Sequence, residues 1–282
     1  MSDFVQQQKG VHDFNSSESW VILSPIEESI KRKIEAVGTP LKDWDINIYR
    51  GVLTGCNEAF IISTAKRDEI LANCQTEEER KRTEELIRPI LRGRDIKRYS
   101  YEWAELWLIA TFPSRHYNIE DYPAVKQYLL SFGIERLEQT GKIHNINGKR
   151  IKSRKKTNNK WFETQDSISY WEDFYKPKLF YADITQHLNF CLCKDVMFCN
   201  NTTYFIATED EKVLEHLNAY LNSPIIDWYY RTLSVQLGEK AVRMFSIYVL
   251  EIPVPPLTMS TDVYKIFGLT PSEKAFIESR VH

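Results

Sequence analysis

Apolar residues follow two kinds of pattern along this chain, and together they predict strands and helices in irregular order. Four short runs have the length and composition of buried strands: LWLIATF (106–112), KLFYADI (178–184), LNFCLC (188–193) and TTYFIA (202–207). Between 213 and 221 the apolar residues instead recur at helical spacing. Because the two types are interspersed without a repeating order, we predict an α+β fold with mixed sheets and flanking helices.

Helix starts are marked by capping boxes, in which Ser or Thr is followed three residues later by Glu. These pairs are Ser24 with Glu27, Thr76 with Glu79, Thr208 with Glu211, and Thr270 with Glu273. Pro25 and Pro271 suit first helical positions, and Gly38 predicts the end of the first helix. Two more helices are predicted, one from Pro123 to Leu137 and one that begins at Ser223 and Pro224.

Two further segments have the composition of strands. Residues 46–63 predict a pair of strands around a tight turn at Thr54–Asn57. The run SIYVLEI (246–252) predicts a short strand before the proline-rich string PVPP.

Composition is that of an ordinary globular chain. Of 282 residues, 43% are hydrophobic and 27% charged, and the net charge of −2 provides no global attraction to a polyanion. No apolar run approaches the roughly 18 residues that a membrane span needs, and the N-terminus lacks a secretory pattern. We therefore expect a cytoplasmic protein that does not bind membranes.

Five cysteines at irregular spacing do not form a disulfide framework. Cys191, Cys193 and Cys199, with His187 upstream, make zinc conceivable, but no C-x-x-C pair is present. The alternation in LNFCLC favours the other interpretation, in which Cys191 and Cys193 share one buried face of a strand. We predict no metal site here.

Positive charge is concentrated in one segment near the middle of the chain. Between Gln139 and Phe162 there is no Asp or Glu, although the segment KRIKSRKKTNNKW (149–161) is rich in Lys and Arg. Such a segment attracts phosphate backbones by releasing counterions. The alternative is a solvated loop without a partner. We interpret it as a hairpin-like cationic projection that meets nucleic acid.

Several catalytic signatures are absent from the sequence. There is no G-x-G-x-x-G loop, no phosphate-binding G-x-x-x-x-G-K-[ST] loop, no G-x-S-x-G elbow and no N-P-P-Y string of DNA adenine methylases. Two D-x-K strings, at Asp95–Lys97 and Asp210–Lys212, leave a metal-dependent nuclease as an alternative, although such a site needs a further carboxylate.

An ordered set of strings resembles the C-terminal specificity domain of TaqI-like and type IIG restriction-modification enzymes. The set begins with GVLTGCNEAFII, PILRGRDIKRY, WLIATF and YPAVKQYLLSF, and continues with KWFE, FYKPKLFYADI, NNTTYFIA, LNAYLNS and YVLEIPVPP. No single string is specific, but their order and spacing match from about Ile46 to Pro256. The closing part is also similar to target-recognition domains of type I specificity subunits.

This resemblance implies a DNA-reading module without catalytic activity of its own. It implies a helical linker at 1–45, a target-recognition domain at 46–258 and a helical tail at 259–282. A DNA adenine methyltransferase domain or subunit, and a nuclease domain, would lie outside this chain. S-adenosylmethionine and Mg would belong to those domains, so we expect no cofactor here and double-stranded DNA as the main partner.

The DNA-binding residues that we predict fall into four groups. The cationic segment supplies Lys149, Arg150, Lys152, Arg154, Lys155, Lys156 and Lys160 for phosphates, with Arg154, Asn158 and Asn159 as base readers. A second basic cluster contains Arg92, Arg94, Lys97 and Arg98. The early turn adds Thr54 and Asn57, and a late connection adds Gln236, Lys240 and Arg243. Aromatic residues Trp161, Phe162, Trp171 and Phe174 are assigned to the core.

A competing hypothesis is a protein-interaction module that docks on a methyltransferase subunit. Ile26, Ile30 and Ile34 form an apolar stripe on the first predicted helix, and a stripe on a short helix needs a partner. The basic loop would then be incidental.

Overall fold

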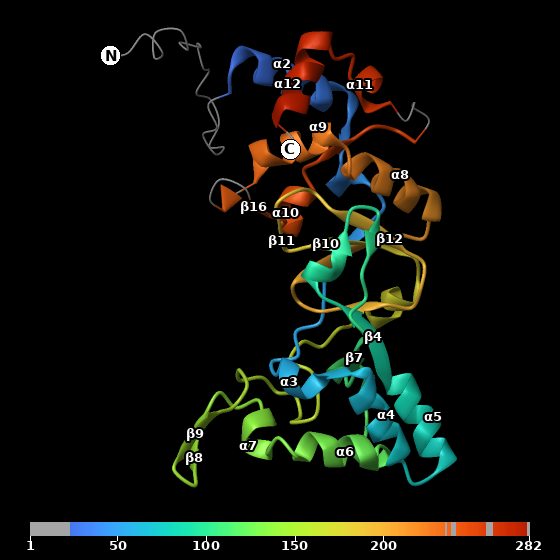
Figure 1. Ribbon diagram of the computed structural model, residues 1–282, viewed down its shortest axis with the longest axis vertical. Coiled ribbons are helices and arrows are strands. Elements are labelled where there is room, and N and C mark those ends of the chain that lie inside the picture. Colours follow the sequence, from blue (N-terminus) through green and yellow to red (C-terminus); the bar gives the residue numbers. More distant parts are fainter. Residues whose placement is uncertain (1–22, 235, 238–240, 258–261, 281–282) are drawn as a thin grey trace. The chain divides into compact units, whose positions relative to one another are not determined.

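The computed structural model describes residues 23–234, 236–237, 241–257 and 262–280 (Figure 1). The chain divides into two compact units. Unit 1 holds the described residues up to Ile46, then Ile184–Leu188, and those from Glu215 onward, whereas unit 2 holds Asn47–Asp183 and Asn189–Leu214. Residues of the predicted recognition range 46–258 thus lie in both units. The interspersed helices and strands confirm the α+β fold.

The first sheet of unit 2 is antiparallel. Its order is β12 (Phe190–Cys193), β10 (Lys178–Ala182), β14 (Thr203–Ala207) and β2 (Asn47–Arg50). Every residue of β10 and β14 is buried, which explains why these strands read as continuous apolar runs. Their prediction is confirmed.

The second sheet of unit 2 has the order β13 (Phe198–Cys199), β4 (Ile87–Leu91), β7 (Leu106–Ile109) and β3 (Ile61–Ser63). Since β2 and β3 belong to different sheets, the predicted strand pair around Thr54–Asn57 is wrong. Residues Asn57–Phe60 form the short helix α3 instead. The Phe60 N–H donates to the Cys56 carbonyl at 3.2 Å, which closes a helical turn in place of a strand.

Unit 2 contains further helices. They are α4 (Thr64–Ala72), α5 (Glu77–Leu86), α6 (Pro123–Leu130) and α7 (Ile134–Leu137). Thr76 caps α5 by accepting a hydrogen bond from the Glu79 N–H at 3.1 Å. The single helix predicted from Pro123 to Leu137 is wrong, because Gly133 adopts φ +82° and separates α6 from α7.

Shorter elements complete unit 2. They are β5 (Ile96–Lys97), β6 (Ser100–Tyr101), β8 (Ile143–Ile146), β9 (Lys149–Lys152), and the 3-10 turns η2 (Gly93–Asp95), η3 (Pro113–Arg115), η4 (Ile119–Asp121) and η5 (Trp171–Tyr175). Helix α8 (Glu211–Leu221) crosses the division between the units. The Asp210 carboxylate accepts from the Lys212 N–H at 2.9 Å, so Asp210 caps α8 in place of the predicted Thr208.

Unit 1 is mainly helical, with α2 (Pro25–Val37), α9 (Pro224–Leu233) and α12 (Pro271–Arg280) as its longer helices. The capping boxes at Ser24 and Thr270 are confirmed. Ile30 and Ile34 on α2 are fully buried within the chain. The apolar stripe that motivated the docking hypothesis is therefore largely covered by the protein itself.

Small sheets and turns make up the rest of unit 1. The strands β1 (Thr39–Pro40) and β17 (Pro253–Val254) pair, and β11 (Ile184–Thr185), β16 (Ala241–Arg243) and β15 (Gln236–Leu237) form a second sheet. The other elements are η1 (Leu41–Asp43), α10 (Ser246–Val249) and α11 (Val263–Ile266). The strand predicted at 246–252 is wrong, because the Val249 N–H donates to the Phe245 carbonyl at 3.1 Å and closes a helical turn.

The cysteines and the core aromatics lie where the sequence places them. Cys191 and Cys193 are buried side chains of β12, and burial raises the pKa of the Cys191 thiol to about 12. Phe162 and Phe174 are buried in the core of unit 2, while Trp161 and Trp171 pack against it. Within the described ranges, no helix combines the length and the apolar character needed to span a bilayer.

Candidate nucleic-acid interface

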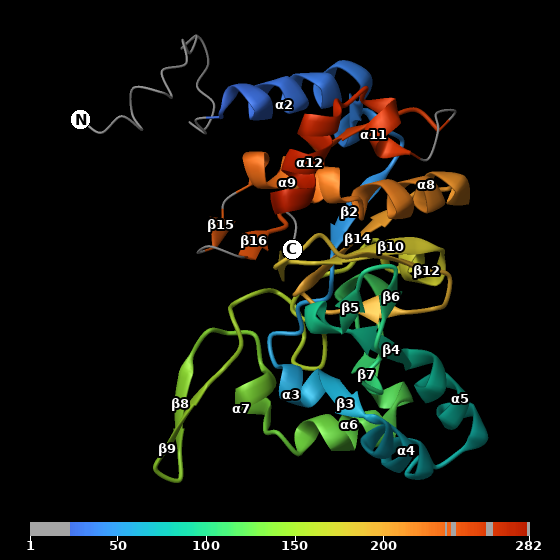
Figure 2. The same cartoon turned by 45° about the horizontal axis from the view of Figure 1, so that its top comes forward.

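The cationic segment contains a regular β-hairpin. Strands β8 and β9 pair antiparallel from Ile143 opposite Lys152 to Ile146 opposite Lys149. Asn147 and Gly148 form the connecting turn with φ of 48° and 75°, as expected for the two-residue turn that an Asn-Gly sequence favours. Figure 2 shows this hairpin extending away from the rest of unit 2. The predicted hairpin-like projection is confirmed.

The two faces of the hairpin differ in character. Asn145 lies opposite Arg150 and Ile143 opposite Lys152, and all four side chains are exposed on one face. The other face carries half-buried residues, among them Ile151. One face therefore presents two cations beside an amide. Asn145 was not among the predicted site residues, although the alternation from 143 to 152 contains the signal.

Arg154, two residues beyond β9, has a different environment from the other cations of the segment. It is 2% exposed, and four hydrogen bonds of 2.7–2.8 Å run from its guanidinium to backbone carbonyls. The acceptors are Leu137, Thr54, Glu163 and Trp161. Burial lowers the pKa of Arg154 to about 10, which leaves it charged at neutral pH. This geometry does not support Arg154 as a base reader, because its donors hold the base of the hairpin together.

Neighbouring polar residues extend this network. The buried Gln139 amide donates to the carbonyls of Lys160, Glu163 and Thr164 at 3.1–3.3 Å. Asn159 donates to the Gln165 carbonyl at 2.9 Å and the Thr164 carbonyl at 3.3 Å. In this conformation both Asn159 amide donors are directed at the chain, so the geometry does not support Asn159 as a base reader. Asn158 is exposed.

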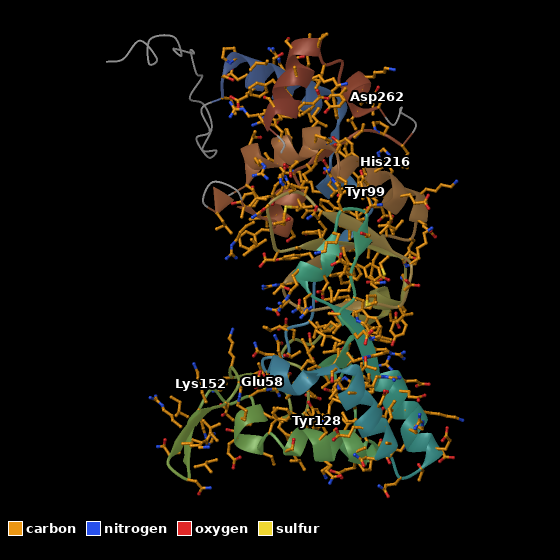
Figure 3. All side chains as sticks on the ribbon, viewed as in Figure 1. Glu58, Tyr99, Tyr128, Lys152, His216 and Asp262 are labelled. Carbon is orange, nitrogen blue, oxygen red and sulfur yellow. The ribbon has the colours of Figure 1, made fainter. Side chains whose placement is uncertain are left out.

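A hollow of about 520 Å³ lies where the hairpin meets the rest of unit 2. Five of its eight lining residues are cations: Arg136, Arg150, Lys152, Arg154 and Lys155. Arg136 on α7 pairs with Glu58 on α3 at 2.6 Å. Figure 3 labels Lys152 and Glu58 on the same side of unit 2. The hollow therefore has a strongly positive wall, in which Arg136 is paired with an acid.

The remaining cations of the segment are exposed and available. Lys149, Arg150, Lys152, Lys155 and Lys156 form no ion pair with any residue in the described part of the chain. The nearby Glu138 carboxylate instead contacts His144 at 2.7 Å. A positive surface whose cations form no ion pair within the described residues is electrostatically suited to phosphate groups.

Comparison with known families identifies the domain. Residues 88–254, more than half of the chain, match the model of the TaqI-like C-terminal specificity domain. The chain belongs to this family. The predicted resemblance to this family is thus confirmed, and the cationic segment lies inside the matched range.

Solved structures resemble this specificity domain at low identity. The type IIG restriction endonuclease BpuSI superposes with a TM-score of 0.52 at 11% identity, covering 90% of this chain and 27% of that chain. The type IIL restriction-modification enzyme MmeI in complex with DNA gives a TM-score of 0.48 at 12% identity over 76% of this chain and 25% of that chain. The first similarity supports the fold. A search of curated proteins gave no match.

The second basic cluster of the specificity domain is only partly available. Arg92 forms a two-pronged pair with Asp95, from Nε at 3.0 Å and from Nη2 at 2.8 Å. Arg92 is therefore a structural residue, contrary to its predicted role on phosphates. Arg94, Lys97 and Arg98 are exposed. The same pair occupies both oxygens of the Asp95 carboxylate, which does not support the nuclease alternative.

The early turn contributes one exposed candidate. The Thr54 side chain is fully buried, and its hydroxyl donates to Asn57 Oδ1 at 2.7 Å and accepts from the Cys56 N–H at 3.1 Å. This geometry does not support the predicted DNA contact by Thr54. Asn57 is exposed at the start of α3.

The late connection lies in unit 1. Arg243 ends β16, and its guanidinium lies over the Phe245 ring at 5.3 Å from the centroid. The backbone of Gln236 belongs to β15. Lys240 lies outside the described residues. These three DNA contacts stay predictions.

Proposed function

We propose that this chain is the sequence-reading DNA module of a restriction-modification enzyme, presenting duplex DNA to a methyltransferase domain or subunit outside the chain. The family assignment supports a specificity role. The observation that carries the proposal is the exposed hairpin, whose cations form no ion pair with an acid among the described residues while buried Arg154 fixes its base. A rigidly anchored basic projection is suited to a groove and its flanking phosphates.

The side chains divide into two tasks. Lys149, Arg150, Lys152, Lys155, Lys156 and Lys160 supply affinity that does not depend on sequence, because they neutralise phosphates. Asn145 and Asn158 are exposed amides among these cations, and an Asn side chain can pair with adenine through a donor and an acceptor. Sequence preference is therefore assigned to the two amides and backbone affinity to the cations.

Methyl transfer and cleavage are assigned to other domains. S-adenosylmethionine and Mg would be bound there, and this chain would contribute target choice. The chain spans 27% of the length of BpuSI, which is consistent with a module that serves a larger enzyme.

A salt titration of duplex binding tests this proposal. We expect the logarithm of the affinity to fall linearly with the logarithm of salt concentration, with a slope that reports the number of phosphate contacts. The double variant Arg150→Gln/Lys152→Gln should lower affinity roughly tenfold at low salt and reduce the slope by about 2. Fluorescence anisotropy with a library of short duplexes provides both measurements.

The matched control is Arg80→Gln/Lys81→Gln on α5, which removes the same charge from the exposed surface of unit 2. This control should bind duplex as the unmodified protein does. If no duplex binds at low salt, with or without a methyltransferase partner, the proposed function is wrong. An equal loss in the control would mean that only overall charge matters.

A further inference from the structure

A second pocket in unit 2 lies apart from the cationic hairpin. Its volume is about 280 Å³, and its lining comes from α5, β4, the segment after β7, and η5. Figures 1 and 2 show α5 and the hairpin on opposite sides of unit 2. The role proposed above for the hairpin therefore does not account for this pocket.

Two arginines in the pocket are held by aromatic rings. The Arg115 guanidinium lies 3.8 Å from the centroid of Trp171 and 5.7 Å from that of Tyr117. Arg88 lies 5.3 Å from the centroid of the Tyr175 ring. Stacking of this kind fixes the plane of a guanidinium, and the Arg115 guanidinium also hydrogen-bonds the Tyr117 phenol. Both cations are thus oriented before any ligand arrives.

Neither arginine has an acidic partner in the described part of the chain. Arg88 and Arg115 form no salt bridge there, and the Arg88 Nε is buried without a hydrogen-bond acceptor. Glu85 is the one acid of the lining, and it pairs with neither of them. Arg82 donates to the Asp121 carbonyl at 3.2 Å. The Arg88 guanidinium, one N–H of which is buried without an acceptor, and the Arg115 guanidinium together make a site suited to an anion.

The rest of the wall is apolar. Leu86, Phe112 and Phe198 are at most 2% exposed and form the floor. Tyr117 and Tyr122 add ring surfaces, and burial raises the pKa of the Tyr117 phenol while Arg115 lowers it. The Tyr117 phenol thus adds no negative charge, and the charged side chains of the lining are those of Arg82, Glu85, Arg88 and Arg115.

We propose that this pocket binds a small molecule in which an anionic group is joined to a flat ring. The anion accepts hydrogen bonds from Arg88 and Arg115, and the ring packs against the more exposed aromatic lining of Tyr117, Trp171 and Tyr175. Nucleoside monophosphates and aromatic carboxylates share this chemistry. The site is near the lower end of the volumes of small-molecule pockets, so it admits one such molecule and not a duplex. The inference goes beyond DNA recognition and does not depend on it.

Calorimetric titration of the full chain with adenosine monophosphate, benzoate and inorganic phosphate tests the site. We expect at least one of the two ring-bearing probes to bind more tightly than inorganic phosphate, and the pair distinguishes a phosphate source from a carboxylate source. Arg88→Gln and Arg115→Gln should each weaken that binding about tenfold or more. Arg80→Gln on α5 removes an exposed arginine outside the lining and should change it by less than about twofold.

Three outcomes would overturn the proposal: no binding of either ring-bearing probe, equal binding of inorganic phosphate, or binding that both pocket variants leave unchanged. Arg115 lies at the exposed rim, so Arg115→Gln keeps the fold, which melting curves verify. Duplex affinity of the same variants should stay unchanged. A failure of ligand binding would therefore not contradict the proposal of DNA recognition. Loss of duplex binding in Arg150→Gln/Lys152→Gln would likewise say nothing against this pocket.

Discussion

Arg150 and Arg154 lie four positions apart in one cationic segment, yet the structure gives them opposite environments. Arg150 is an exposed residue of the hairpin, whereas Arg154 is buried and bonded to four backbone carbonyls. The same residue type therefore provides surface charge at one position and internal cross-linking at the other. Charge density in a sequence thus locates an interface without saying which of its cations face the partner.

The largest expected effect is on stability at the base of the hairpin. Arg154→Met should lower the free energy of unfolding by about 3–5 kcal/mol, because four buried carbonyls lose their charged donor. Urea denaturation followed by circular dichroism measures the change.

Arg150→Met is the control for this prediction, since it removes the same charge from an exposed position and should change stability by less than about 0.5 kcal/mol. Equal stabilities for the two variants would contradict the distinction between the exposed Arg150 and the buried Arg154.

A smaller effect separates the two adjacent amides of the segment. Asn159→Ala should cost about 1–2 kcal/mol of stability, because its amide donates to the Thr164 and Gln165 carbonyls. Asn158→Ala should leave stability unchanged and alter the preference among duplex sequences by about 1–3 kcal/mol. Denaturation and selection from a random duplex library measure the two effects. The reverse assignment, with preference carried by Asn159, would mean that the segment rearranges on DNA.

Local signals in the sequence predict the helix starts and the buried strands, because nearby residues determine the backbone conformation there. Ser24 with Glu27, Thr270 with Glu273, and Pro224 mark helix starts that the structure confirms. Fully buried strands such as β10 and β14 were equally readable, because both faces are apolar. At Gly133 the apolar spacing continued through a break that one positive φ creates, so the sequence predicted one helix in place of two.

Long-range contacts limited what could be predicted about the site. Arg154 bonds to the Thr54 carbonyl, 100 positions away in the chain, and no local pattern around either residue indicates this contact. Arg92 pairs with Asp95, only three residues away, and the sequence alone places these opposite charges close together. Asn145 was overlooked because the hairpin had been read as a charge cluster and not as two alternating strands.

The smallest expected effect concerns pH at the base of the hairpin. Hydrogen bonding from Thr140, together with His144, holds the pKa of the Glu138 carboxyl below its ordinary value of 4.5, although burial opposes the shift. Because the folded state binds this proton less readily than the unfolded state, the carboxylate adds stability above about pH 4.5 and loses it as the pH falls through the folded pKa. Glu138→Gln should lower the free energy of unfolding by less than about 1 kcal/mol at neutral pH, with the difference from the unmodified protein vanishing in acid.

Melting temperatures from pH 7 to pH 3 check this, with Glu135→Gln on α7 as control. Duplex affinity at neutral pH should not change, since Glu138 supports the base and the exposed cations remain in place. A large loss of duplex affinity would instead mean that the exposed cations depend on Glu138 for their position.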